Sequence, residues 1–194
     1  ETAGNFDSLQ SMFDRLGRDS IFTGEVKELT AHLMNSSNAL EKDDNSSLHG
    51  ALPLKLHGVY TKSQIQVAIG TSTLARKSSG REGCERTVMN GKAVEAMFVD
   101  IIKNREEGST TNYNDFAQSS MKFHWETQNK VSQDSATGRK YIKQEQTMLL
   151  FVRKQAKAAE NSNRTMGYTY LGEVTLDSYH GNYPIQIVWK LKSP

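Results

Sequence analysis

The sequence predicts an α+β domain with a strongly curved β-sheet or small β-barrel and flanking helices, preceded by a short helical segment. Three observations favour this class. Short apolar runs rich in β-branched residues follow one another between residues 96 and 191, and polar turns separate them. The last run alternates apolar and polar residues, and helical spacing is confined to residues 1–70. A chain of 194 residues can hold one core-bearing domain and an appendage.

Charge divides the chain into two parts. Residues 1–50 carry 4 Lys/Arg against 9 Asp/Glu, whereas residues 51–194 carry 20 against 13. The change occurs in residues 35–50, which have no periodicity and many turn formers, as a linker has. We therefore predict that residues 1–50 are a helical linker or the end of a preceding domain, and that residues 51–194 form one domain.

Capping residues mark three predicted helices. Asp7 with Gln10 has the spacing of a capping box and begins a helix that ends before Gly17. A second helix is predicted to begin at a Thr23 cap. The Thr61–Gly70 segment predicts a third, because Thr61 and Gln64 form another capping-box pattern and the glycine ends the apolar face.

The remaining segments are typical of β structure. Residues 96–102 are mostly apolar with β-branched members, residues 148–152 are a continuous apolar run, and both predict buried strands. Residues 168–176 predict two short strands on either side of Gly172. Residues 185–191 alternate, so Ile187 and Trp189 share one face, which we expect to lie in the core.

The stretch Thr110–Ile142 is unusual because four aromatics, Tyr113, Phe116, Phe123 and Trp125, stand among Asn, Gln, Ser, Thr and Lys. An ordinary core strand would carry Val and Ile between its aromatics. Aromatic faces beside amide, carboxylate and hydroxyl groups suit a flat polar ligand such as a nucleobase. The alternative is a polar loop whose aromatics belong to the core.

Basic residues supply candidate phosphate contacts in two places, a Gly/Ser/Arg-rich loop within residues 75–92 and the aromatic stretch with its flank. The candidates are Arg76, Lys77, Arg81, Lys122, Lys130, Arg139 and Lys140. The basic surplus is compatible with steering to nucleic acid. It is equally compatible with simple solubility, and solvated surface is the more common fate of such residues.

Several classes of protein are excluded or disfavoured by what the sequence lacks. It contains no G-x-x-x-x-G-K-[ST] phosphate loop, no G-x-S-x-G elbow and no His pair with metal-ligand spacing. We find no catalytic constellation, and we expect no cofactor and no metal. With no apolar run of about 18 residues we expect no membrane span. The lone Cys84 fits a cytoplasmic protein. The start lacks signal-peptide features and an initiator Met, so we expect a fragment boundary there.

An ordered series of motifs carries a family resemblance over about residues 52–192. The series is Leu52-Pro53-Leu54, Tyr60-Thr61, Arg81-Glu82-Gly83, Thr111-x-Tyr113-x-Asp115-Phe116, Ser119, Phe123-His124-Trp125-x-x-Gln128, Ser135-x-x-Gly138-x-x-Tyr141-Ile142, Leu150-Phe151-Val152-Arg153, Tyr170-Leu171-Gly172 and Pro184-x-x-x-Val188-Trp189-x-Leu191. It resembles the C-terminal domain of superfamily II helicase-like proteins. The best-described hosts are ATP-dependent, modification-dependent (type IV) restriction endonucleases of the SauUSI type. Family members often have Tyr in place of Phe116 and Ser in place of Thr127.

The resemblance implies an SRA-like or PUA-like reader that flips a modified cytosine out of double-stranded DNA, and we expect the modification to be 5-methylation. It implies helicase and nuclease domains elsewhere in the parent chain, with no catalysis by this part. The base-binding pocket is then expected among Tyr113, Asp115, Phe116, Ser119, Phe123, His124, Trp125 and Gln128. On an extended backbone Tyr113 and Asp115 share a face, and a carboxylate can accept from the cytosine amine. In the competing interpretations Asp115 caps a turn, and the domain is a protein-interaction or regulatory module.

Overall fold

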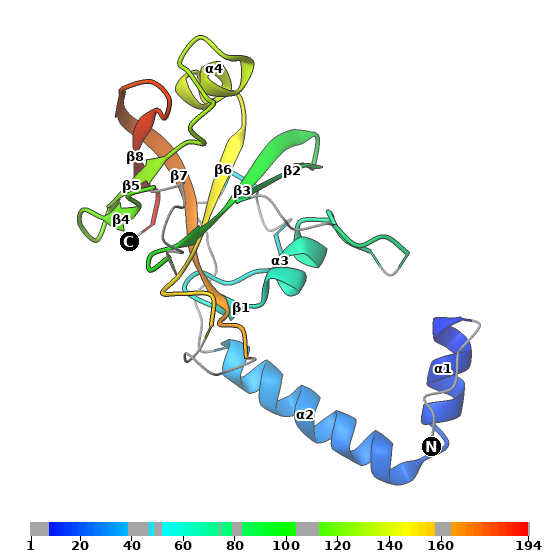
Figure 1. The fold of residues 1–194 in the computed structure, drawn as a ribbon. Coiled ribbons are helices and arrows are strands. Elements are labelled where there is room, and N and C mark those ends of the chain that lie inside the picture. Colours follow the sequence, from blue (N-terminus) through cyan, green and yellow to red (C-terminus); the bar gives the residue numbers. More distant parts are fainter. Residues whose placement is uncertain are drawn as a thin grey trace. The chain divides into compact units, whose positions relative to one another are not determined.

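The computed structural model of the chain (Figure 1) describes residues 8–38, 47–48, 52–73, 75–78, 83–103, 113–157 and 164–193. The chain divides into two compact units, Glu1–Leu40 and Glu41–Pro194. Each unit is described by itself below. The domain boundary expected at residue 50 stays a prediction.

The first unit contains the helices α1 (Leu9–Leu16) and α2 (Ser20–Asn38). The predicted cap of α1 was wrong, because Ser8 is the N-cap and forms a reciprocal capping box with Ser11; Asp7 lies outside the described residues. Gly17 ends the helix as predicted.

Helix α2 begins earlier and ends later than the sequence predicted. The Asp19 carboxylate accepts hydrogen bonds from the backbone N–H groups of Ile21 and Phe22 at 3.0 and 3.1 Å. Asp19 therefore caps the helix in place of Thr23, whose hydroxyl donates to the Asp19 carbonyl. The helix continues to Asn38, four residues into the predicted linker. None of the described helices is long and apolar enough to cross a membrane.

The second unit has one mixed sheet, curved and not closed, so the predicted α+β class with a curved sheet is confirmed. Its strands, within the described residues, are β1 (Val59–Tyr60), β2 (Cys84–Met89), β3 (Lys92–Asp100), β4 (Phe116–Ala117), β5 (Lys122–Glu126), β6 (Thr147–Arg153), β7 (Tyr168–His180) and β8 (Gln186–Leu191). The order is β2-β3-β6-β7-β8-β5-β4, and β1 pairs with β7. Only the β3–β6 pair is parallel among these pairings.

One strand prediction was wrong, and one strand was not predicted. Residues 168–180 form one continuous strand, β7, where two short strands were expected. Gly172 has a φ of +92°, and the pairing with β6 shifts register between Leu150 and Phe151, so the irregularity bends the strand without ending it. Residues 84–89, for which no strand was predicted, form the edge strand β2.

The two faces of the sheet bury separate hydrophobic clusters. Helix α3 (Lys62–Ala68) and the segment before it cover one face, over Phe98, Phe151 and Tyr170. Leu48, from the segment interpreted as a linker, is 1% exposed and belongs to this cluster. Helix α4 (Ala136–Ile142) packs on the other face, where its Tyr141 lies in the second cluster.

Several local predictions are confirmed. The Thr61–Gln64 capping box begins α3, and Gly70 follows that helix with a φ of +76°, a conformation that glycine adopts without strain. Ile187 and Trp189 are both fully buried in the second cluster. The closing strand therefore packs as its alternation predicted.

Candidate functional site: a cavity at the ends of β3 and β6

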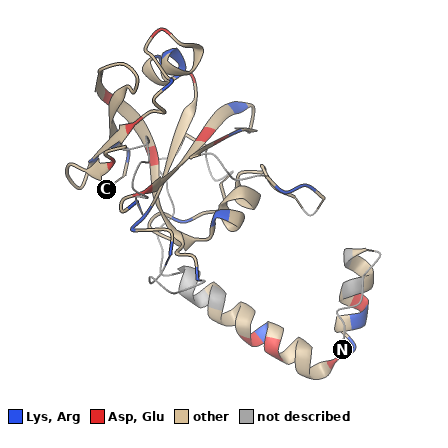
Figure 2. Ribbon diagram, viewed as in Figure 1, with Lys and Arg blue, Asp and Glu red and all other residues tan. Residues whose placement is uncertain are grey.

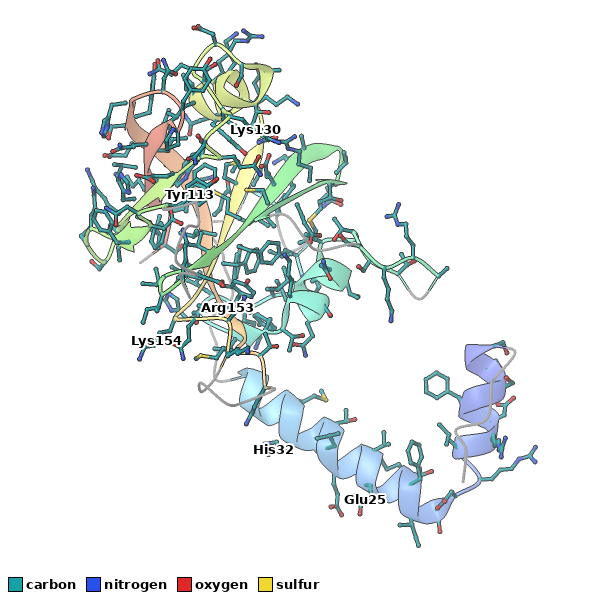
Figure 3. All side chains as sticks on the ribbon, in the orientation of Figure 1. Glu25, His32, Tyr113, Lys130, Arg153 and Lys154 are labelled. Atoms are coloured by element: carbon teal, nitrogen blue, oxygen red, sulfur yellow. The ribbon has the colours of Figure 1, made fainter. Side chains whose placement is uncertain are left out.

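A cavity of about 990 Å³ opens where the parallel strands β3 and β6 end. These strands finish side by side at Asp100 and Arg153, which are register partners. Although β3 and β5 are not neighbours in the sheet, the curvature brings their side chains into one cluster, which contains both Val99 and Trp125. In Figure 3 the lining residues Lys130, Tyr113 and Arg153 follow one another from top to bottom of the sheet-bearing unit. The cavity therefore extends from the loop after β5 to the end of β6.

Lys103 joins the segment after β3 to the segment before β4. Its ammonium donates to Asp115 Oδ2 at 2.7 Å and to the Tyr113 carbonyl at 3.1 Å. It also lies 4.9 Å from the centre of the Tyr113 ring, a cation–π contact. One side chain thus fixes the backbone and the ring of Tyr113 and the carboxylate of Asp115.

A second set of hydrogen bonds fixes Asp115 against β5. Asp115 Oδ1 accepts from the backbone N–H of Glu126 at 2.9 Å, and Glu126 Oε2 accepts from the backbone N–H of Asn114 at 3.0 Å. The Asp115 side chain is only 5% exposed. A carboxylate that caps a turn accepts from backbone N–H groups close to it in the chain. The partners of Asp115, Lys103 and Glu126, are instead each more than ten residues away.

Tyr113 and Trp125 are the aromatic residues that line the cavity near Asp115. Tyr113 is half-buried and lines the cavity. Trp125 also lines it, but the indole packs edge-on against Tyr141, with ring centroids 5.4 Å apart, and is 8% exposed. Trp125 is consequently both a core residue and part of the cavity wall.

The other end of the cavity combines two cations with two aromatic rings. The Lys62 ammonium lies 4.5 Å from the centre of the Phe98 ring, and the Arg153 guanidinium lies 4.3 Å from that of Tyr168. Asp100 accepts from Arg153 Nε at 2.7 Å and from a terminal nitrogen at 2.9 Å.

Burial changes the proton affinity of this end. It lowers the pKa of Lys62, and the charge of Arg153 lowers that pKa further, against the opposing effect of Glu85. Burial, helped by the charge of Asp100, raises the pKa of Tyr168. A negatively charged group at this end of the cavity would therefore stabilise the charged form of Lys62 and raise its pKa.

Four predicted pocket residues lie outside the cavity lining. Phe123 is 2% exposed in the core, and Phe116 stacks on His124 with centroids 4.8 Å apart. His124 Nδ1 is 2.7 Å from the Asn114 carbonyl oxygen, and the Ser119 hydroxyl accepts backbone N–H bonds within its own turn. Tyr113, Asp115, Trp125 and Gln128 do line the cavity. A base-contacting role for any of the eight stays a prediction.

The candidate phosphate contacts are dispersed. Lys130 lines the cavity, Lys122 pairs with Asp177 at 2.8 Å, and Arg139 donates to the Asp134 carbonyl. Figure 2 shows basic residues on α3, on α4 and at the β2–β3 hairpin. The remaining candidates lie on α4 or in the loop after α3: Lys140, Arg76 and Lys77. Arg81 is outside the described residues.

Sequence reasoning missed five charged lining residues, Lys62, Asp100, Lys103, Glu126 and Arg153. Arg153 directly follows the predicted strand 148–152, and Asp100 is the charged residue within the predicted strand 96–102, where β3 ends. That position was a usable signal, because charged residues at adjacent strand ends meet at one edge of a sheet. Within the described residues, no three His, Cys, Asp or Glu side chains gather as metal ligands would.

Comparison with known proteins gives the family of the chain and a structural likeness. The chain covers 57% of the 5-hydroxymethylcytosine-specific restriction enzyme AbaSI, with 98% of its own residues aligned, a TM-score of 0.41 and 14% identity. No curated protein matches the chain. The family model described as "Domain of unknown function (DUF3427)" matches residues 54–194, well over half of the chain. The chain belongs to this family.

Proposed function

We propose that the sheet-bearing unit reads a modified, 5-methylated cytosine in double-stranded DNA, with the base flipped into the cavity. One observation carries the proposal: a single cavity brings together the Tyr113 ring, the Asp115 and Glu126 carboxylates and the Gln128 amide. These are a stacking surface and hydrogen-bonding groups, which a flat polar ligand requires. Four cations, Lys62, Lys103, Lys130 and Arg153, line the same cavity and favour a ligand that carries phosphate.

The cost of extruding a base is similar in size to the energy that the cavity can return. Extrusion of a base costs a few kcal/mol, and stacking on an aromatic side chain returns about 1–3 kcal/mol. A carboxylate has about four acceptor sites, so Asp115 can accept from a cytosine amine while it keeps its bonds to Lys103 and Glu126. Burial of one methyl group adds about 0.8 kcal/mol, so the fit of the cavity wall must supply the remaining discrimination.

The parent activity is the second part of the proposal. The order of motifs supports a reader that directs an ATP-dependent type IV restriction helicase-nuclease, with motor and nuclease domains on the same parent chain. The AbaSI likeness is too distant to add to this reasoning, which rests on the motifs and on the cavity.

The test is a competition assay with duplexes that differ in one base, which is cytosine, 5-methylcytosine or 5-hydroxymethylcytosine. We expect the protein to prefer the 5-methylated duplex. Asp115→Asn should abolish the preference and retain weak, salt-sensitive binding, whereas Asp134→Asn, at an exposed carboxylate outside the cavity, should leave the preference intact. Equal affinity of the unchanged protein for all duplexes would refute the proposal and favour the protein-interaction module.

A further inference from the structure

The end of the cavity furthest from the loop after β5 has a chemistry that base reading does not use. Lys62, Phe98, Tyr168 and Arg153 form a continuous series there. The Phe98 and Tyr168 rings meet edge to face, with centroids 5.3 Å apart. Lys62 lies over the Phe98 ring and Arg153 over the Tyr168 ring, each in a cation–π contact. All four residues line the cavity.

Hydrogen bonds and ion pairs hold the two cations in place. Asp100 binds Arg153 through Nε and one terminal nitrogen, and the other terminal nitrogen donates to the Met166 carbonyl at 3.2 Å. A guanidinium has five N–H groups, so bonds to the described residues leave two of them for a ligand. The Lys62 ammonium is 4.0 Å from Glu85, whose two oxygens also accept from Gln66 and Thr71.

Partial burial strengthens the attraction of these two charges for an anion. The side chain of Arg153 is 11% exposed and that of Lys62 is 25% exposed, so water screens them less than it screens surface lysines. Two positive charges at one end of a cavity attract an anion such as a phosphate. Hydrogen bonds from charged donors to phosphate oxygens are also among the strongest in proteins.

We propose that Lys62 and Arg153 form a phosphate subsite, which binds the phosphate of the nucleotide whose base occupies the Tyr113–Asp115 end. The identity of that nucleotide rests on the proposed function, whereas the phosphate subsite rests on the residues above. A bound phosphate adds negative charge beside Lys62 and restores the proton affinity that burial and Arg153 reduce. Phosphate binding should therefore be accompanied by proton uptake at a pH where Lys62 is partly neutral.

The experiment measures the affinity of the whole chain for small probes by calorimetry. The probes are 2′-deoxycytidine, its 5′-monophosphate, the methyl diester of that phosphate, and the 5-methylcytosine counterpart of each. The variant is Lys62→Met, which keeps the packing of the stem on Phe98. The matched control is Lys154→Met, which removes an exposed lysine that follows Arg153 in the chain and does not line the cavity (Figure 3).

We expect the unchanged protein to bind both phosphate-bearing probes at least about tenfold more tightly than the nucleoside. Lys62→Met should remove this advantage without weakening nucleoside binding, and Lys154→Met should preserve it. Equal affinity for nucleoside and nucleotide, or an unchanged advantage in Lys62→Met, would overturn the subsite. Binding of the monoester alone would overturn its assignment to a DNA phosphate.

The outcomes separate this inference from the proposed function. If methylated and unmodified nucleotides bind equally and both weaken in Lys62→Met, the phosphate subsite stands and the preference for 5-methylcytosine fails. If methylated probes bind more tightly but the phosphate adds no affinity, the preference for 5-methylcytosine stands and the phosphate subsite fails. Absence of binding by every probe at millimolar concentration would contradict the subsite.

Discussion

Removal of Lys103 should damage the cavity more than an ordinary surface lysine would. In Lys103→Met the Asp115 carboxylate, whose side chain is 5% exposed, loses its ammonium donor and keeps the Glu126 N–H. A hydrogen bond between charged groups contributes about 1.5–3 kcal/mol, and a buried pair that loses one partner costs about 3–5 kcal/mol. Lys103 itself is 28% exposed, which favours the lower end, about 2 kcal/mol.

The assay is a double-mutant cycle in urea with Lys103→Met, Asp115→Asn and the combination. About 2 kcal/mol corresponds to a fall of about 4–8 °C in the melting temperature of a unit of this size. Asp115→Asn keeps an acceptor for the Glu126 N–H, and in the double variant no buried charge is left without its partner. The double variant should therefore cost about 1 kcal/mol or more less than the sum of the single changes. Additive costs would refute the role of Lys103 as the residue that positions Asp115.

Three further predictions concern the core, the surface charges and pH. Trp189→Ala should cost about 3–5 kcal/mol in urea unfolding, whereas Trp189→Phe should cost less, because among the described residues the buried indole N–H has no acceptor; equal costs would contradict this. Neutralisation of Arg139 and Lys140 should reduce the slope of log K against log salt by about one for each true phosphate contact, and an unchanged slope would mark them as solvated surface. Burial lowers the pKa of Lys62, so between that pKa and the unfolded value of about 10.4 the unfolded state binds more protons and stability rises with pH. Lys62→Met should lack this rise, and a pH-independent difference in unfolding free energy between it and the parent would refute the prediction.

Local sequence signals predicted much of the sheet-bearing unit. The Thr61–Gln64 box, the buried run at 148–152 and the alternation in β8 each depend on neighbouring residues, and each appears in the structure. Strand β2 was missed because its three apolar residues, Cys84, Val88 and Met89, do not alternate with polar ones. Glu85 and Arg86 find partners only in tertiary structure, with Gln66 and Glu95.

The arrangement of the site depended on contacts that are distant in the chain. The aromatic stretch pointed to Tyr113 and Asp115, but not to Lys103, because that pairing requires β3 to end opposite β5 across a curved sheet. Alternation of side chains along β5 separates Phe123 and Trp125 from His124, and no local signal tells which aromatic lines a cavity. Curvature, set by features such as the register shift between β6 and β7, decides this.

The most direct test of the central claim observes the modified base in its place. A duplex with a ¹³C-labelled 5-methyl group on one cytosine is bound to the ¹⁵N-labelled protein, and the methyl resonance is followed by NMR. The account predicts a ring-current shift of that methyl resonance and nuclear Overhauser effects to the ring protons of Tyr113 and Trp125. Selective binding in which the methyl resonance keeps its position in the free duplex and shows no contact with either ring would contradict the account.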